Sequence, residues 1–123
     1  MPSIGVTLFE SNPIIAQSLA SSLGEHFRSV HVAASIDELK QSIAKHRDAV
    51  AIVDLEPTEL DMVADLHHEF PAVSIVCTHR LADEGMWTAV LDAGGSDVCH
   101  PADTQGILQS AIRSAQHLRA AVA

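Results

Sequence analysis

The chain has 123 residues, enough for one domain that buries about two thirds of its unfolded surface, and we expect residues 1–123 to form it. Its 16 acidic residues against 7 Lys and Arg give a formal net charge of -9, which argues against direct nucleic-acid binding because that binding depends on clustered cations. Hydrophobic residues make up 47% of the chain, yet no stretch approaches the roughly 20 apolar residues of a membrane span. The start of the chain also lacks the basic and apolar regions of an export signal, so we expect a cytoplasmic protein without a membrane partner.

Short apolar runs alternate with helical patterns along the chain. In chain order, the runs predict strands at residues 4–9, 30–34, 49–54, 73–78 and 96–99. The helices that follow them are predicted from Pro13 to Gly24, from Ser35 onward, over residues 59–70 and 81–93, and from a cap at Asp103 or Thr104 onward, with Leu118 on the inner side of the last one. Strict alternation with short connections favours right-handed crossovers. We predict an α/β, flavodoxin-like three-layer sandwich with a five-stranded parallel sheet in the order 2-1-3-4-5.

Polar residues stand where four of the predicted strands end. The first strand is followed by Glu10 and Ser11, the third ends in Asp54, the fourth in Thr78, and the fifth is followed by His100. Ligands of parallel α/β sheets bind outside the carboxyl ends of the strands, and these four strands are neighbours in the predicted order. We therefore expect the five side chains to converge on one crevice.

This set resembles the CheY-like receiver domain of two-component response regulators, and the resemblance covers essentially the whole chain. Residues 9–15 resemble the segment that carries an acidic pair, and residues 53–55 the phosphoacceptor segment. Residues 76–78 resemble the segment of the switch hydroxyl, and residues 92–101 the end of the fourth helix with its Lys-Pro turn.

The resemblance implies specific roles and partners. Asp54 would accept a phosphoryl group from a histidine kinase, Thr78 would be the switch hydroxyl, and His100 stands at the usual Lys position. The signal would pass through the face formed by the fourth helix, fifth strand and last helix. The partners would be an effector domain, another protein or a second copy of the chain in a homodimer.

The site departs from the usual receiver pattern at the second acid and at the lysine, which are Ser11 and His100 here. The implied Mg²⁺ ligands are Glu10, Asp54 and the main chain of Glu56, with Ser11 contributing a neutral oxygen or a water, so we expect weak Mg²⁺ binding. Two carboxylates and the imidazole of His100 would suit Mn²⁺ better than Mg²⁺. The site is therefore predicted to be atypical.

Other chemistries of this fold require motifs that the sequence lacks. The first strand is not followed by a Gly-rich phosphate loop, and neither cysteine begins the Cys-x5-Arg loop of small phosphatases. The eight histidines match no zinc-binding spacing. We therefore expect no conventional enzyme activity. Cys77 and Cys99 lie on adjacent predicted strands and allow a redox-pair hypothesis, which the geometry of disulfides disfavours.

Two functions remain open. The domain is either a receiver phosphorylated on Asp54, weakly or unconventionally, or a pseudo-receiver that acts as a protein-interaction module without phosphorylation. Residues 12–19 resemble the opening of receivers that carry a C-terminal helix-turn-helix domain, so the chain could be the receiver of a transcription regulator. Trp87, the only tryptophan, is either an exposed interface anchor or packed under the loop after Thr78.

Overall fold

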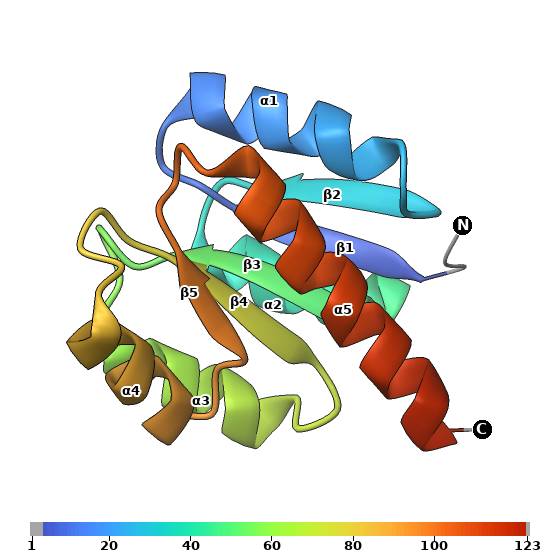
Figure 1. Ribbon diagram of the computed structural model, residues 1–123. Helices are drawn as coiled ribbons and strands as arrows, with labels where there is room; N and C mark the ends of the chain where they lie inside the picture. The colour runs from blue at the N-terminus through green and yellow to red at the C-terminus, as the bar shows by residue number, and fades with distance from the viewer. Residues whose placement is uncertain (1–3, 123) are drawn as a thin grey trace.

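The computed structural model describes residues 4–122, with side chains up to residue 116 (Figure 1). Strands and helices alternate strictly along these residues. In chain order they are β1 (Gly5–Phe9), α1 (Pro13–Gly24), β2 (Ser29–Ala33), α2 (Ile36–His46), β3 (Val50–Asp54), α3 (Leu60–Glu69), β4 (Ser74–Thr78), α4 (Glu84–Asp92), β5 (Asp97–Cys99) and α5 (Thr104–Val122). None of these helices is both long and apolar enough to cross a membrane.

The five strands form one parallel sheet in the order β2-β1-β3-β4-β5, which confirms the predicted topology. Helices α1 and α5 cover one face of this sheet, and α2, α3 and α4 cover the other (Figure 1). Because the strands are parallel, all of them end at the same edge of the sheet, and this places the predicted polar groups at one edge.

Side-chain caps set the starts of the first two helices. The Asn12 side chain accepts hydrogen bonds from the amides of Ile14 and Ile15, at 2.9 and 3.3 Å. At α2, the Ser35 hydroxyl accepts from the Glu38 amide at 3.1 Å. The Glu38 carboxylate reaches back to the amide of Ala34, one residue before the cap, instead of the cap's own amide.

The predicted start of the fourth helix is wrong by three residues. The apolar pattern suggested a start at Leu81, but α4 begins at Glu84 because the Asp83 side chain accepts from the Met86 amide at 2.9 Å and caps the helix there. Of the two predicted caps for α5, Asp103 is the one used, since its carboxylate accepts from the Gly106 amide at 3.0 Å. The predicted inner position Leu118 lies outside the described side chains.

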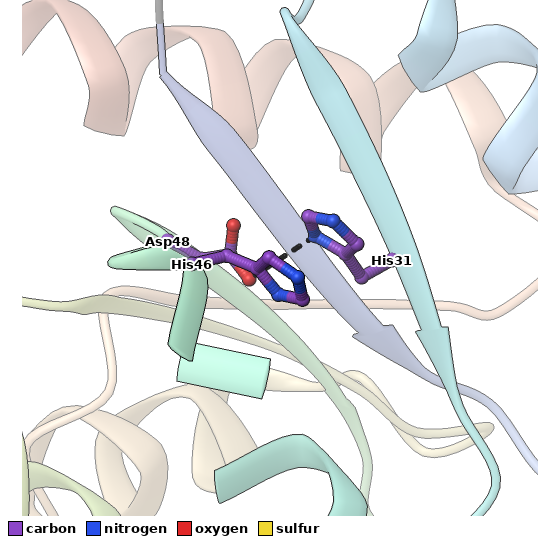
Figure 2. A group of neighbouring side chains, drawn as sticks. All are labelled: His31, His46 and Asp48. Atoms are coloured by element: carbon purple, nitrogen blue, oxygen red, sulfur yellow. Dashed lines mark ion pairs between the residues drawn. The ribbon is translucent and has the colours of Figure 1, made fainter. Parts of the chain in front are cut away.

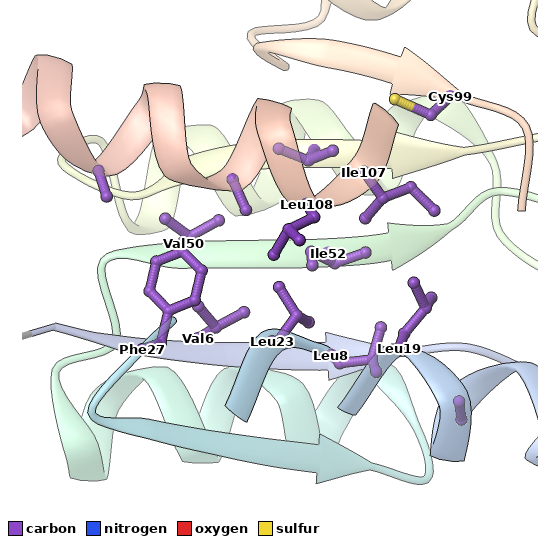
Figure 3. Close-up of a cluster of buried hydrophobic side chains, with 14 residues drawn as sticks. Val6, Leu8, Leu19, Leu23, Phe27, Val50, Ile52, Cys99, Ile107 and Leu108 are labelled. Atoms are coloured by element: carbon purple, nitrogen blue, oxygen red, sulfur yellow. The ribbon is translucent and has the colours of Figure 1, made fainter. Parts of the chain in front are cut away.

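Aliphatic side chains build both layers of the core. Figure 3 shows the layer between the sheet and helices α1 and α5, where Phe27 is the one aromatic ring among the labelled residues. The opposite layer packs β-strand residues such as Ala51 and Val53 against α2, α3 and α4. Because β3 contributes side chains to both layers, all of its residues are buried, and only its carboxyl end is available for chemistry.

Cys77 and Cys99 belong to different layers of the core. Cys77 pairs in register with Val98, and Cys99 pairs with Thr78, so the two cysteines are offset by one residue in the register of β4 and β5. Successive side chains of a strand point to opposite faces of a sheet. Both thiols are free and lie on opposite faces of the sheet, so the redox-pair hypothesis is wrong.

Candidate functional site

Asp54 is the centre of the polar group at the carboxyl edge of the sheet. It is the last residue of β3 and is only 1% exposed. One carboxylate oxygen, Oδ2, accepts from both the amide and the hydroxyl of Ser11, at 3.0 and 2.5 Å. The other, Oδ1, accepts from the amide of Glu56 at 2.9 Å. The side chain is thus held by the chain segments that follow β1 and β3.

Glu10 supplies the second acid of the site. It is 9% exposed, and its Oε2 accepts from the amide of Asn12 at 2.8 Å. Its other oxygen, Oε1, is buried and has no hydrogen-bond partner among the described residues. Burial raises the pKa of Glu10, and the neighbouring Asp54 carboxyl raises it further against the opposing effect of the Asn12 amide. Glu10 is therefore the acid of the pair that holds a proton more readily.

The pKa of Asp54 shifts in the opposite direction. Burial raises it, but the hydrogen bonds from the Ser11 hydroxyl and from the amides of Ser11 and Glu56 together outweigh burial and leave the pKa below its usual value. Donors aimed at a carboxylate stabilise its charged form. Asp54 is consequently a preorganised anion at neutral pH, which is the state that a nucleophilic carboxylate needs.

Thr78 ends β4 directly opposite Asp54 in the strand register. It is 1% exposed, and its hydroxyl oxygen has no hydrogen-bond partner among the described residues. A buried hydroxyl without a partner loses its solvation without compensation. The hydroxyl is therefore free to bond a further group at this edge of the sheet.

His100 is directed toward its own turn. Its Nδ1 accepts from the amide of Ala102 at 3.0 Å, and the residue is exposed. Within residues 4–116, no hydrogen bond or ion pair joins the ring to Glu10 or Asp54. Its role at the usual Lys position stays a prediction, and the geometry gives it no contact with the acids.

An ion pair that the sequence analysis missed lies beside the site. The carboxylate of Glu56 accepts from the backbone amide of Arg80 at 2.8 Å and pairs with its Nε at 3.1 Å. The amide contact from Arg80 lowers the pKa of Glu56, and the Glu56 carboxylate raises the pKa of Arg80, with a smaller contribution from the Asp54 charge. Asp54 and Thr78 are paired in the strand register, and Glu56 and Arg80 each stand two residues beyond them. The pairing of the two strands could therefore have indicated that Glu56 and Arg80 lie close together.

The residues at this edge fit a divalent cation only in part. The unpartnered Oε1 of Glu10 and the anionic carboxylate of Asp54 are oxygen ligands of the kind that Mg²⁺ takes. The Ser11 hydroxyl contributes no charge and already donates to Asp54. The carbonyl of Glu56 stays a predicted ligand. The site offers at most two negative charges, and one oxygen is already shared by two donors, so weak Mg²⁺ binding stays a prediction.

Comparisons with known proteins bear on the fold. No protein-family model matches the sequence, and no curated protein matches it either. Solved structures match closely in shape. The receiver domain of a response regulator from Bacteroides fragilis is 19% identical over 92% of this chain and 98% of its own, with a TM-score of 0.81.

Two further structures agree. A Francisella receiver domain is 15% identical over 94% of this chain and 98% of its own, with a TM-score of 0.82. The Salmonella typhimurium response regulator RcsB is 20% identical, with a TM-score of 0.81; the match covers 95% of this chain and 61% of that longer protein. The chain therefore has the fold of response-regulator receiver domains, with five parallel strands in the order 2-1-3-4-5.

Proposed function

We propose that this domain is a receiver module of a two-component system that accepts a phosphoryl group on Asp54, with an unconventional surrounding site. The observation that carries this proposal is the state of Asp54: a buried, ionised carboxylate at the carboxyl end of the central strand, beside a second acid and an unpartnered hydroxyl. The structural likeness supports it, and the isolated receiver domain of RcsB, 19% identical, has been solved with the phosphate mimic BeF3⁻.

The reaction would be a transfer between two side chains. A carboxylate oxygen of Asp54 attacks the phosphorus of a phosphohistidine on the kinase, the phosphorus–nitrogen bond breaks, and the histidine leaves as a neutral imidazole after taking up a proton. The product is an acyl phosphate on Asp54. Oδ1 has one hydrogen-bond donor and Oδ2 has two, so Oδ1 is the oxygen better able to attack.

The surrounding residues would stabilise the charge that develops on the phosphoryl group. When bound, Mg²⁺ supplies positive charge that offsets the charge of the transferring oxygens. Glu10 and Asp54 would hold it, and Thr78 would donate its free hydroxyl to a phosphoryl oxygen. Arg80, already held by Glu56 at the rim, would provide the fixed cation that His100 does not, because His100 faces its own turn.

The output surface of the proposed receiver is the α4 side of the molecule. Leu81, Trp87 and Leu91 are exposed there, at 66%, 47% and 38%, and Trp87 and Leu91 are one turn apart on α4. Of the two predicted environments for Trp87, the exposed one is observed. Half-exposed tryptophans are frequent anchors of protein interfaces, so we infer that this side contacts an effector domain, a partner protein or a second copy.

A pseudo-receiver is the second candidate, and one observation favours it. The Ser11 hydroxyl donates to Oδ2 of Asp54 at 2.5 Å, so a neutral donor already occupies one of the two oxygens that would hold a cation. In this state Asp54 is stabilised as a structural anion that joins the ends of β1 and β3. The domain would then act through partner binding alone, with the same α4 side as its contact surface.

Phosphorylation by acetyl phosphate distinguishes the two candidates. Wild type incubated with acetyl phosphate and Mg²⁺ should gain the mass of one phosphoryl group, and Asp54→Asn should not. Asp61→Asn, on the exposed side of α3, is the matched control and should be phosphorylated as wild type is. Failure of wild type to gain mass, together with no BeF3⁻-induced NMR shifts at Thr78 and in α4, would establish the pseudo-receiver. A mass gain that persists in Asp54→Asn would remove Asp54 from the role.

A further inference from the structure

A second cluster of ligand-type side chains lies at the β2 edge of the sheet, among His31 on β2, His46 at the end of α2, and Asp48 two residues later (Figure 2). One potential ligand atom from each residue lies within 4.8 Å of the other two. The two imidazole rings are stacked, with centroids 3.7 Å apart and planes 8° from parallel. His31 and His46 both line a surface hollow of about 450 Å³.

The carboxylate of Asp48 is buried, and its hydrogen bonds only partly replace the water that burial removes. It is 2% exposed, its Oδ2 accepts from the hydroxyls of Thr7 and Ser42, and its Oδ1 is buried without a hydrogen-bond partner. The only basic group paired with it among the described side chains is the imidazole of His31, whose Nδ1 lies 3.4 Å away. A buried charge is costly unless it is paired or coordinates a metal ion. The cluster therefore has a place for a cation.

One distance in the cluster matches the value expected between two ligands of a tetrahedral ion. Bonds of about 2.0–2.2 Å from Zn²⁺ to imidazole nitrogen and carboxylate oxygen place neighbouring ligand atoms about 3.4 Å apart. The His31 Nδ1 to Asp48 Oδ2 distance of 3.4 Å has this value. The Ser42 hydroxyl contacts both Asp48 Oδ2, at 3.1 Å, and His46 Nδ1, at 3.3 Å. Hydroxyls in this position resemble the outer-shell partners that orient metal ligands.

The stacking of the rings sets a condition for binding. Parallel imidazoles direct their lone pairs along parallel planes, so an ion held by both rings requires one ring to tilt. His31 is fixed on a strand, whereas His46 is in the last turn of α2 and borders the hollow. Rotation of His46 about its side-chain bonds would release its contact with Ser42 and direct a ring nitrogen toward the ion, while Ser42 keeps its hydrogen bond to Asp48 and orients that ligand. Binding should therefore break the stack.

We propose that His31, His46 and Asp48 form a binding site for one divalent transition-metal ion of the Zn²⁺ class, with water from the hollow as the fourth ligand. Two imidazoles and one carboxylate favour such ions over Mg²⁺, which prefers an all-oxygen shell. The site is separate from the Asp54 edge and does not depend on phosphorylation.

Calorimetric titration of the full chain with ZnCl₂ tests the proposal. We expect one Zn²⁺ per chain in wild type, with affinity retained in the double variant His67→Ala/His68→Ala, which removes an exposed histidine pair on α3. His31→Ala and His46→Gln should each raise the dissociation constant more than about tenfold, and Ser42→Ala by about 10–100-fold. Millimolar Mg²⁺ should not compete, and Zn²⁺ should shift the ring resonances of His31 and His46 together.

Two outcomes would overturn the proposal. Binding of equal affinity in wild type, His31→Ala and His46→Gln would place the ion on other surface histidines. Absence of binding in wild type, with unchanged ring resonances of His31 and His46, would show a cluster held by hydrogen bonds and stacking alone. His31→Gln provides a second variant at the strand position if the alanine variant fails to fold.

Discussion

Ser11 donates both its backbone amide and its side-chain hydroxyl to the same carboxylate oxygen of Asp54. The contact joins the segment after β1 to the end of β3, and it controls both the charge of Asp54 and the space around it. A residue that was expected to provide at most a weak ligand is therefore the closest partner of the proposed phosphoacceptor.

Ser11→Ala should destabilise the domain in a pH-dependent way. The folded-state pKa of Asp54 is lowered, so its contribution to stability is present above the pKa of the unfolded state and is lost as the pH falls through the folded value. Loss of the hydroxyl donor should lower the free energy of unfolding by about 1–2 kcal/mol at pH 7. The difference from wild type should shrink below about pH 4.

Urea unfolding from pH 3 to pH 7 measures this effect. Ser18→Ala, an exposed position on α1, is the control and should change stability by less than about 0.5 kcal/mol. A Ser11→Ala penalty that is constant over this pH range would contradict the role of the hydroxyl as a partner of the Asp54 anion.

Ser11→Asp should strengthen Mg²⁺ binding. The substitution replaces a neutral donor on Asp54 by a third carboxylate, which adds charge next to Glu10 and Asp54. An added charge at contact distance contributes about 1–2 kcal/mol at a partly solvated site, which corresponds to roughly tenfold in affinity. Isothermal titration with MgCl₂ measures the change. Equal affinity in the variant and in wild type would show that the cation, if bound, lies away from position 11.

Arg80→Met should slow phosphorylation of Asp54 by acetyl phosphate roughly tenfold, equivalent to about 1.4 kcal/mol in the barrier. The folded state should lose little stability, because the Glu56–Arg80 pair is solvent-exposed and such pairs add little. Arg28→Met, an exposed arginine before β2, is the matched control and should leave the rate unchanged. Identical rates for both variants would mean that Arg80 only orders the loop.

Cys77 should remain unreactive until the domain unfolds. Burial, helped by the nearby charges of Asp97 and Cys99, raises the pKa of its thiol to about 12 from an ordinary value of 9.0. A raised pKa contributes stability that is fully present below the unfolded value and is lost as the pH rises through the folded one. Between pH 9 and 12 the free energy of unfolding should therefore fall by about 1.4 kcal/mol per pH unit because of this group.

Comparison with Cys77→Ala isolates that slope from the contributions of other groups. In Cys99→Ala, where Cys77 is the only thiol, the rate of labelling by a disulfide reagent should equal the rate of global unfolding. Fast labelling of Cys99→Ala under native conditions would contradict a buried thiol.

Gly94→Ala should destabilise the domain by about 1–3 kcal/mol. Gly94 has a φ of 101°, and a Cβ atom there would lie 2.5 Å from the ring of His67. Gly24→Ala at the end of α1 is the control, because a Cβ atom there meets no heavy atom within 4 Å. That substitution should be neutral or stabilise by up to about 1 kcal/mol. Thermal unfolding of both variants measures these changes in stability. A Gly94→Ala variant as stable as wild type would show that the turn can change its backbone conformation to accept the side chain.

The order and type of the elements could be predicted because the evidence is local in the chain. The apolar run ending at Asp54 and the capping signals at Asn12 and Ser35 lie within a few residues of the elements they define. The start of α4 was missed because Leu81 continues the apolar pattern, whereas the Asp83 cap decides the boundary. Local hydrogen bonding overrides periodicity at such ends.

The site was predicted in its backbone placement and less well in its side-chain contacts. Strand ends alone placed Glu10, Ser11 and Asp54 together. The direction of His100 depends on a rotamer chosen by its own turn, which no spacing encodes. His31 and His46 are fifteen residues apart, on a strand and on the following helix, so only the packing of α2 against the sheet joins them.

The exposure of Trp87 on α4 makes the chain an optical reporter of its own surface. The sequence has one tryptophan and no tyrosine, so near-ultraviolet fluorescence excited at the indole band comes from this single side chain, which is 47% exposed. A protein that covers α4 would shift the emission toward shorter wavelengths by excluding water from the ring. Events on that side of the molecule can therefore be followed in the unlabelled wild-type protein.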